Sequence, residues 1–267
     1  MTVRDTLPDV FPDTRPGTLH DRHALVTGAG RGIGAAIARR LVSAGARVTL
    51  LGRTRAALDA TAATLEDRVQ GIVVCDVTDA ASVSAAVAAM PPVDILINNA
   101  GAAASASLGR TTDELWARML AVNLTGPFHC ARAVLPAMLE SGWGRIVTVA
   151  STAALRGYPY VSAYAAAKHG VLGFTRSLAL EVATRGVTVN AVCPGFTDTD
   201  LLQESVANIM ARTGRSETDA RAALAALNPQ GRFIAPEDVA EAVCWLCAPA
   251  ADAVTGIALP ISGGEVM

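Results

Sequence analysis

Short runs of valine, leucine and isoleucine alternate with longer alanine-rich stretches along most of the chain. The short runs have the length of strands buried on both faces, and the longer stretches have the length of helices. This alternation is typical of a parallel sheet with helices on both faces. Strands are expected at residues 23–27, 47–51, 72–74, 93–97, 145–149, 187–192 and 257–261. Helices are expected at residues 32–44, 54–67, 111–122, 127–139, 160–184 and 236–246.

Local signals refine this organisation. Thr111 and Glu114 have the spacing of a capping box, which predicts a helix start there. Residues 196–234 break the alternation and are too long for an ordinary loop, so we expect them to be partly helical and to form a lid over a substrate pocket. Since no repeat or linker interrupts the pattern, residues 21–267 are expected to form a single domain after a mobile leader at residues 1–20.

Charge and composition exclude several classes of protein. The chain of 267 residues has 22 Lys and Arg against 24 Asp and Glu, without the basic excess that nucleic-acid binding needs. No run of about 20 apolar residues occurs, and the first residues lack the core of a signal peptide, so we expect a cytoplasmic protein without membrane contact. Cys244 and Cys247 form a CxxC in an apolar helix with no second pair nearby, which favours buried thiols, and we expect no bound metal.

A glycine-rich turn follows the first expected strand and opens the first expected helix. It runs from Thr27 to Gly34 and reads TGAGRGIG. Glycines permit a tight turn and let a pyrophosphate approach the backbone N–H groups at the helix N-terminus. A glycine cluster is weak evidence by itself, but its place between a strand and a helix indicates a dinucleotide site.

The spacing of these glycines resembles that of the short-chain dehydrogenase/reductase family. Further motifs in the family's order carry the resemblance from about residue 21 to 264: CDV at 75–77, NNAG at 98–101, VNL around Asn123, Ser151, Tyr164 with Lys168, and PGFTDT at 194–199. The resemblance implies an α/β chain with a single-domain Rossmann fold, a doubly wound seven-stranded parallel sheet with helices on both faces. It also implies an NAD(P)-dependent oxidoreductase that acts on CH–OH donors.

The resemblance and the glycine turn together predict the cofactor contacts. Asp76 and Val77 are expected to border the adenine, residues 98–101 to line the adenosine ribose region, and residues 194–199 to hold the nicotinamide carboxamide. The expected cofactor-binding residues are Gly28, Gly30, Arg31, Gly32, Ile33, Gly34, Arg53, Asp76, Val77, Asn98, Ala100, Gly101, Tyr164, Lys168, Pro194, Gly195, Thr197 and Thr199.

The end of the second expected strand bears on the choice of cofactor. Enzymes that use NAD usually carry an acid there, which accepts a hydrogen bond from the ribose 2′-OH. This chain has Arg53 instead, and a guanidinium pairs strongly with a 2′-phosphate. Arg31 is a second candidate for this contact. The alternative is that either arginine is a solvated surface charge, and for Arg31 alone this alternative is a serious one. NADP(H) is therefore favoured, and NAD(H) stays open.

The candidate catalytic residues are Tyr164 and Lys168, four residues apart on an expected helix and so on one face of it. A free tyrosine has a pKa of about 10, and a neighbouring ammonium lowers that pKa. Tyr158 and Tyr160 lack a lysine at this spacing. Ser151 directly follows an apolar strand, which places it at the carboxyl end of the sheet, where α/β proteins bind ligands.

The family resemblance assigns a role to each catalytic candidate. Tyr164 exchanges a proton with the substrate oxygen, and Lys168 lowers the pKa of Tyr164 and binds the nicotinamide ribose. Ser151 hydrogen-bonds the substrate oxygen, and Asn123 holds a water molecule of the proton relay.

The segments expected to bound the substrate pocket are rich in Ala, Leu, Phe and Tyr, which favours an apolar or acyl-bearing ketone over a sugar. Locally the chain resembles 3-oxoacyl-acyl-carrier-protein reductases and polyketide ketoreductases, which implies a 3-oxoacyl thioester or related ketone. Arg156 is a candidate for a thioester phosphate, with an exposed arginine as the simpler interpretation. The resemblance also implies a homo-oligomer, commonly a tetramer, with the helix at 160–184 in an interface.

Two alternatives remain open. The first is an NAD-dependent dehydrogenase of a secondary alcohol, such as a 3-hydroxyacyl or 3-hydroxybutyrate-like substrate. Val161 argues against it, because 3-hydroxybutyrate dehydrogenases usually carry a lysine at that position. The second is a non-catalytic cofactor-binding regulatory protein, which ranks low because all four catalytic candidates are present.

Overall fold

The computed structural model of the chain describes residues 18–267. Most of the predicted leader at residues 1–20 therefore lies outside the described residues. The strands are β1 His23–Thr27, β2 Arg47–Gly52, β3 Val69–Val74, β4 Ile95–Asn98, β5 Gly144–Val149, β6 Val187–Pro194 and β7 Ala258–Ile261. The α-helices are α1 Gly32–Ser43, α2 Arg55–Ala62, α3 Ala80–Ala88, α4 Asp113–Leu120, α5 Gly126–Ser141, α6 Ser162–Val182, α7 Asp200–Thr213, α8 Glu217–Ala225 and α9 Pro236–Cys247.

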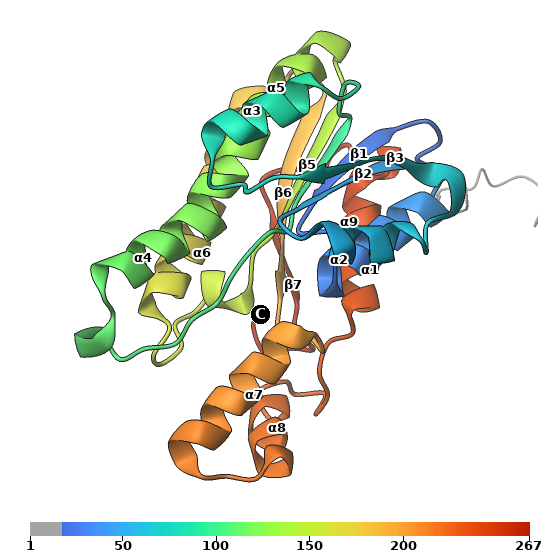
Figure 1. Ribbon diagram of the computed structural model, residues 1–267. Helices are drawn as coiled ribbons and strands as arrows, with labels where there is room; N and C mark the ends of the chain where they lie inside the picture. Colours follow the sequence, from blue (N-terminus) through green and yellow to red (C-terminus); the bar gives the residue numbers. More distant parts are fainter. Residues whose placement is uncertain (1–17) are drawn as a thin grey trace, which may run out of the picture.

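The seven strands form one sheet in the order β3-β2-β1-β4-β5-β6-β7, and all of its pairs are parallel. The predicted α/β architecture is therefore confirmed. Figure 1 shows α1, α2 and α9 on one side of the sheet and α3 to α6 on the other. The strand order reverses between β1 and β4, and a ligand site is expected outside the carboxyl ends of the strands at such a point.

Alternation along each strand explains why both faces are covered. Val26 and Ile97 pack in the cluster that includes α1 and α9, whereas Leu25 and Leu96 pack in the cluster that includes α5 and α6. All four side chains are fully buried. Because successive strand residues point to opposite faces, continuous apolar runs require helices on both sides.

Three local features differ from the sequence-based expectations. Helix α3 was not predicted; Asp79 starts it by accepting hydrogen bonds from the N–H groups of Ala81 and Ser82. The predicted capping box at Thr111 is wrong by one residue, because Thr112 caps α4 by accepting from Leu115 N–H. The two predicted helices at 111–122 and 127–139 are joined by a turn of π-helix at Ala121–Thr125.

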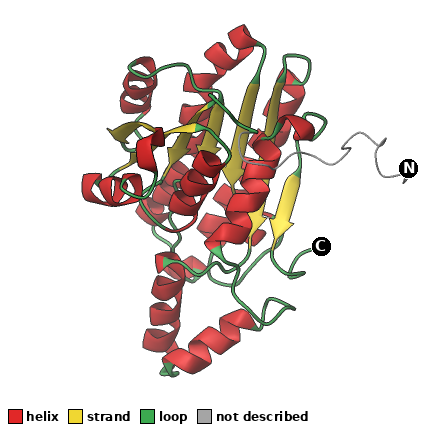
Figure 2. Cartoon of the chain, turned by 90° about the vertical axis from the view of Figure 1, so that its right-hand side faces the viewer, coloured by secondary structure: helices red, strands yellow, loops and turns green. Residues whose placement is uncertain are grey.

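The predicted lid is largely helical. Helices α7 and α8 project as a pair from the rest of the molecule in both views (Figures 1 and 2). Leu202, Val206 and Ala220 form their small buried core. An isolated bridge between Thr197 and Ile234 closes the base of this segment.

Candidate active site

The turn between β1 and α1 is compact because glycine occupies its crowded positions. Gly28 has a φ of +64°, and a Cβ on it would lie 2.9 Å from the Cα of Ala100. A Cβ on Gly34 would lie 2.3 Å from the carbonyl oxygen of Gly28. Side chains at these positions would push the turn away from the loop that follows β4.

The first turn of α1 leaves its backbone N–H groups open to a ligand. Arg31 is the N-cap residue and makes no side-chain capping hydrogen bond, and the first turn carries no acidic residue. Uncapped N–H groups and the helix dipole together favour an anion. The predicted residues Gly28, Gly30, Arg31, Gly32, Ile33 and Gly34 all lie on this turn. The turn therefore fits the diphosphate of a dinucleotide.

Asn99 supports this turn; it lies in the segment 98–101 that was predicted to line the adenosine ribose region, although the single residues expected to bind the cofactor include Asn98 and not Asn99. Its side-chain amide donates to the carbonyl oxygens of Thr27 and Gly28, at 3.0 and 3.1 Å. The hydroxyl of Thr27 accepts hydrogen bonds from the N–H groups of Asn99 and Ala100, each at 3.0 Å. The loops after β1 and β4 are thus tied together at the point where the strand order reverses.

The side chain of the neighbouring Asn98 points toward α5 instead. Its side-chain nitrogen donates to the carbonyl oxygen of Pro127 on α5 at 3.5 Å, and its side-chain oxygen is buried without a hydrogen-bond partner among the described residues. Within the predicted segment 98–101, it is therefore Asn99, Ala100 and Gly101 that adjoin the glycine turn or the catalytic residues. The NNAG motif holds both asparagines, and only the pairing of β1 with β4 shows which of them faces the turn.

The residues predicted for the adenosine end lie where β2 and β3 end. Arg53 follows β2 directly, is exposed, and forms no hydrogen bond or ion pair with residues 18–267. Asp76 accepts two hydrogen bonds from Thr78, which lower the pKa of this carboxyl, and the positive charge of Arg53 acts in the same direction. Val77 is buried against Gly126. Arg31 instead forms an ion pair with Asp200 of α7, with 3.0 Å between nitrogen and oxygen.

Tyr164, Ser151 and Lys168 come together at the carboxyl end of the sheet. Ser151 lies just beyond β5, and its hydroxyl accepts a hydrogen bond from Ala153 N–H at 3.1 Å. Ser151 is close enough to the Tyr164 phenol on α6 to lower the pKa of that phenol. The Lys168 ammonium lies one turn further along α6, 5.7 Å from the centre of the Tyr164 ring, and donates to the carbonyl oxygen of Val149 at 2.9 Å.

Burial is the largest cause of the pKa shifts of Tyr164 and Lys168. It raises the pKa of Tyr164, and the nearby Ser151 side chain offsets part of that rise. Burial also lowers the pKa of Lys168 to about 8, because the charged ammonium loses hydration. The lowering of the Tyr164 pKa that was expected from Lys168 therefore does not overcome desolvation. Tyr164 is protonated near neutral pH and is suited to donate a proton.

Asn123 lies in the π-helical turn between α4 and α5. Its side-chain nitrogen donates to the carbonyl oxygens of Ala102 and Met119, at 2.9 and 3.0 Å. A Cβ on Gly101 would lie 3.1 Å from the side-chain oxygen of Asn123 and 3.9 Å from the Lys168 nitrogen. Gly101 therefore lies close to both side chains. Single π-helical turns are frequent at functional sites, and this one carries Asn123 to the same glycine that Lys168 approaches.

The loop after β6 lies against the glycine turn. A Cβ on Gly32 would lie 3.1 Å from the Cγ2 methyl of Thr199, which is the N-cap residue of α7. Thr197 is buried and donates from its hydroxyl to the carbonyl oxygen of Gly195 at 3.0 Å. The predicted residues Pro194, Gly195, Thr197 and Thr199 therefore connect the end of β6 to the turn that fits a diphosphate.

The described part of the chain also bears on metal sites, reactive thiols and membrane-spanning helices. Among residues 18–267 no three His, Cys, Asp or Glu side chains form a possible metal site. Cys244 and Cys247 are buried free thiols in α9, as predicted. No helix of the described chain is long and apolar enough to cross a membrane.

Comparisons with known proteins identify the family of the chain. The family model for short chain dehydrogenases matches residues 22–210. A Streptomyces coelicolor protein that is named as a ketoacyl reductase is 43% identical over 254 residues, covering 90% of this chain and 95% of its own length. A 3-oxoacyl-acyl-carrier-protein reductase of Vibrio cholerae is 40% identical over 253 residues, covering 93% and 99%.

A solved structure is similar to this chain in both sequence and fold. A variant of actinorhodin polyketide ketoreductase with NADPH superposes with a TM-score of 0.88 and 42% identity, covering 92% of this chain and 97% of that one. The chain belongs to the short-chain dehydrogenase/reductase family and is an oxidoreductase.

Proposed function

We propose that this protein is an NADP(H)-dependent carbonyl reductase that acts on a 3-oxoacyl thioester or a related apolar ketone. The observation that carries the proposal is the convergence of Ser151, Tyr164 and Lys168 at the carboxyl end of the sheet, with the Lys168 ammonium 5.7 Å from the centre of the Tyr164 ring. The names of the relatives, which describe reduction of ketoacyl groups, support the substrate class.

Each catalytic residue has a task that its surroundings support. Bound NADPH supplies the hydride. The Tyr164 hydroxyl donates a proton to the carbonyl oxygen of the substrate, and the Ser151 hydroxyl hydrogen-bonds the same oxygen. Lys168 donates one hydrogen bond to Val149, so its other two N–H groups are available to ribose hydroxyls and to a water molecule held by Asn123.

The preference for NADP(H) is carried by the end of β2. Arg53 stands where an NAD enzyme usually carries an acid, and its guanidinium has no partner among the described residues. A free guanidinium suits a 2′-phosphate. Arg31 is a weaker candidate, because its ion pair with Asp200 would have to loosen first. The NADPH in the similar ketoreductase structure supports the same choice.

The test is a panel of ketones and alcohols assayed with NADPH and with NADH, read by the absorbance of the reduced nicotinamide. We expect reduction of 3-oxoacyl thioesters with a higher kcat/KM for NADPH, and we expect Arg53→Ala to lower the kcat/KM for NADPH alone. Arg55→Ala is the matched control, because Arg55 is exposed and pairs with Asp59 on α2. A preference for NADH that Arg53→Ala leaves unchanged would transfer the proposal to the NAD-dependent alternative.

We also propose that the protein is a homo-oligomer assembled through α4, α5 and α6. Their outer surface exposes Trp116, Phe128 and Leu180, with 42, 39 and 82% of the side chains accessible. Large apolar side chains on neighbouring helices are typical of an interface. Light scattering on the wild type and on Leu180→Asp tests this assembly, since a charge within the interface is expected to yield smaller particles.

A further inference from the structure

The last described segment of the chain carries a carboxyl group to the end of the sheet. After β7 the chain turns back at Ser262, and Glu265 lies against the loop that follows β6. A Cβ on Gly195 would lie 3.0 Å from the Oε2 oxygen of Glu265. Figure 1 marks the end of the chain between the sheet and the start of α7. Glu265 is therefore on the same side of the sheet as Ser151 and Tyr164.

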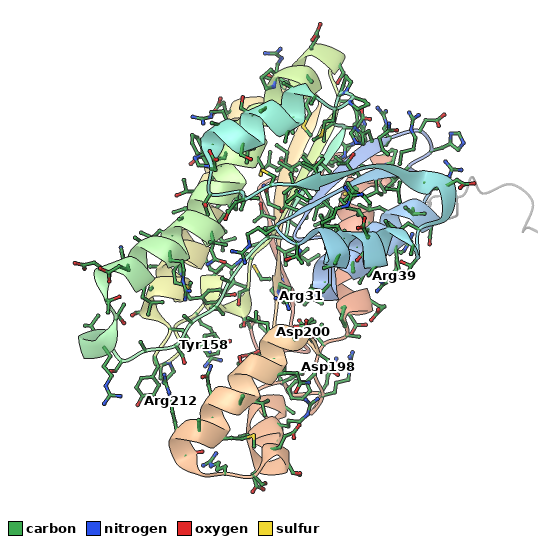
Figure 3. The ribbon with its side chains drawn as sticks, viewed as in Figure 1. Arg31, Arg39, Tyr158, Asp198, Asp200 and Arg212 are labelled. Atoms are coloured by element: carbon green, nitrogen blue, oxygen red, sulfur yellow. The ribbon has the colours of Figure 1, made fainter. Side chains whose placement is uncertain are left out.

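Tyr158 holds this carboxyl group. Its hydroxyl donates a hydrogen bond to the Oε1 oxygen of Glu265, and the nearby Thr152 side chain acts to lower the Tyr158 pKa. Burial and the bond to Glu265 raise the pKa of Tyr158 to about 12, so its phenol stays protonated and keeps donating at any physiological pH. Figure 3 shows Tyr158 on the side of the main body that faces the lid.

The pair adjoins the proposed catalytic centre through consecutive residues. Thr152, which is near enough to affect the Tyr158 pKa, directly follows Ser151, which affects the Tyr164 pKa in the same way. Tyr158 and Glu265 are both half-buried, so neither is a freely solvated surface group. The Oε2 oxygen of Glu265 accepts no hydrogen bond from residues 18–267, and a carboxylate oxygen has unused acceptor capacity.

We propose that Tyr158 and Glu265 form a specificity-determining subsite, in which the free oxygen of Glu265 accepts a hydrogen bond from a hydroxyl group that the ketone substrate carries away from its reacting carbonyl. The inference rests on the proposed function, because it takes Ser151 and Tyr164 as the place where the carbonyl binds. It adds a polar acceptor to the substrate pocket, which the sequence predicted to be apolar. A site with a buried acceptor discriminates against an analogue that lacks the donor, because the acceptor then loses water without a replacement.

The experiment compares matched ligands that differ only in the donor. The probes are 2-tetralone, its four ring-hydroxylated isomers and the corresponding methoxy ethers, which have similar shape but cannot donate. For each probe, kcat/KM is measured with NADPH, and binding to the protein with NADP⁺ present is measured by calorimetry. Variants are Glu265→Leu, Glu265→Gln and Tyr158→Phe. Glu217→Gln is the matched control, because Glu217 is an exposed carboxyl on α8.

We expect one hydroxy isomer to exceed its methoxy ether by about 10-fold or more in kcat/KM and in affinity, as a hydrogen bond to a charged acceptor implies. Glu265→Leu should abolish that preference while the rate with unsubstituted 2-tetralone changes by less than about 3-fold. Tyr158→Phe should reduce the preference, because the carboxyl group loses its anchor, and Glu265→Gln should retain part of it. Glu217→Gln should leave all ratios unchanged.

Three results would overturn the inference: no hydroxy isomer is preferred by the wild type, the preference survives in Glu265→Leu, or Glu265→Leu weakens NADPH binding with all probe ratios unchanged. The last result would assign the carboxyl group to the cofactor. Hydroxyl-selective binding that Glu265→Leu abolishes, in a protein that reduces no ketone, would support the subsite and contradict the proposed reductase. The two proposals therefore fail in distinguishable ways.

Discussion

The main body and the lid of this molecule are stabilised by different kinds of contact. In the body, strand residues such as Leu96 are completely buried between helix layers. The lid has a core of three buried residues and exposes Leu201, Met210 and Leu227. Its side-chain ties to the body include the ion pair between Arg31 and Asp200 and the hydrogen bond from Arg212 to the carbonyl oxygen of Ser105. Figure 3 shows these ties at opposite ends of α7.

Because their contacts differ, the body and the lid are expected to have different functions. The catalytic side chains lie on elements of the body, where packing holds Tyr164 and Lys168 in place. The predicted lid has few buried apolar contacts, so we expect it to open at a small free-energy cost while the body remains folded. We therefore expect body substitutions to change chemistry or global stability, and lid substitutions to change substrate and cofactor binding.

The largest expected effect is the loss of the proton donor in the body. Tyr164→Phe removes the hydroxyl that lies near Ser151, and general acid catalysis contributes about 10²- to 10⁴-fold. We expect kcat for ketone reduction to fall by about that factor, with the melting temperature nearly unchanged. Tyr160→Phe is the control, because that side chain is 63% exposed and should lose nothing. Activity retained in Tyr164→Phe would contradict the assigned role.

Two matched leucine truncations compare the regions directly. Leu96→Ala in β4 is expected to lower the free energy of unfolding by about 2–5 kcal/mol, the usual range for a buried leucine. Leu202→Ala in α7 should lower it by less than about 1 kcal/mol, because the lid opens without the body, and should raise KM instead. Urea unfolding and steady-state kinetics measure both quantities. Equal losses of stability would show that lid and body unfold as one unit.

The pH dependence of reduction is set by a group in the body. Burial lowers the pKa of Lys168 to about 8, so its ammonium is lost as the pH rises through that value. We expect kcat to fall by up to about 10-fold per pH unit above 8, because the charge that stabilises the developing phenolate disappears. Burial raises the pKa of Tyr164, so deprotonation of the phenol does not produce this break. A rate that stays constant to pH 10 would exclude Lys168 from the relay.

The lowered pKa of Lys168 also sets how the free energy of unfolding depends on pH. An unfolded lysine keeps its proton to a pKa of about 10.5, whereas folded Lys168 releases it near 8. Between these values the unfolded state binds more protons, so this residue destabilises the fold less as the pH rises. The difference in unfolding free energy between wild type and Lys168→Met should therefore change with pH across this window, and not below it.

The smallest expected effect is that of breaking the ion pair between lid and body. Arg31 and Asp200 are 70 and 64% exposed, and exposed ion pairs contribute about 0.2–1 kcal/mol. Asp200→Asn should raise KM by no more than about 5-fold, and high salt should remove the difference from wild type. Asp59→Asn breaks an exposed pair within α2 and is the control, with no expected change in KM. A loss of kcat in Asp200→Asn would give the lid a part in chemistry.

Much of the body was predictable because its signals are local. Continuous apolar runs identified the strands, and the glycine turn and the Tyr164–Lys168 spacing identified both parts of the site. The weaker signals were the ones that depend on a single side chain. Helix α3 was missed because its start depends on the carboxyl group of Asp79 and its alanine-rich sequence has little amphipathic pattern. The spacing of Thr111 and Glu114 favoured Thr111 as the cap, but in the structure the neighbouring Thr112 caps α4.

The amino-acid sequence by itself determined the class of fold, the dinucleotide turn and the catalytic residue types, because each depends on spacing along one strand or one helix. Only the tertiary structure decided which asparagine supports the glycine turn, where Arg31 finds its partner, and that Tyr158 meets Glu265. These contacts join residues that are 71, 169 and 107 positions apart, and no local periodicity encodes them. They arise because the carboxyl ends of the parallel strands bring distant loops to one edge of the sheet.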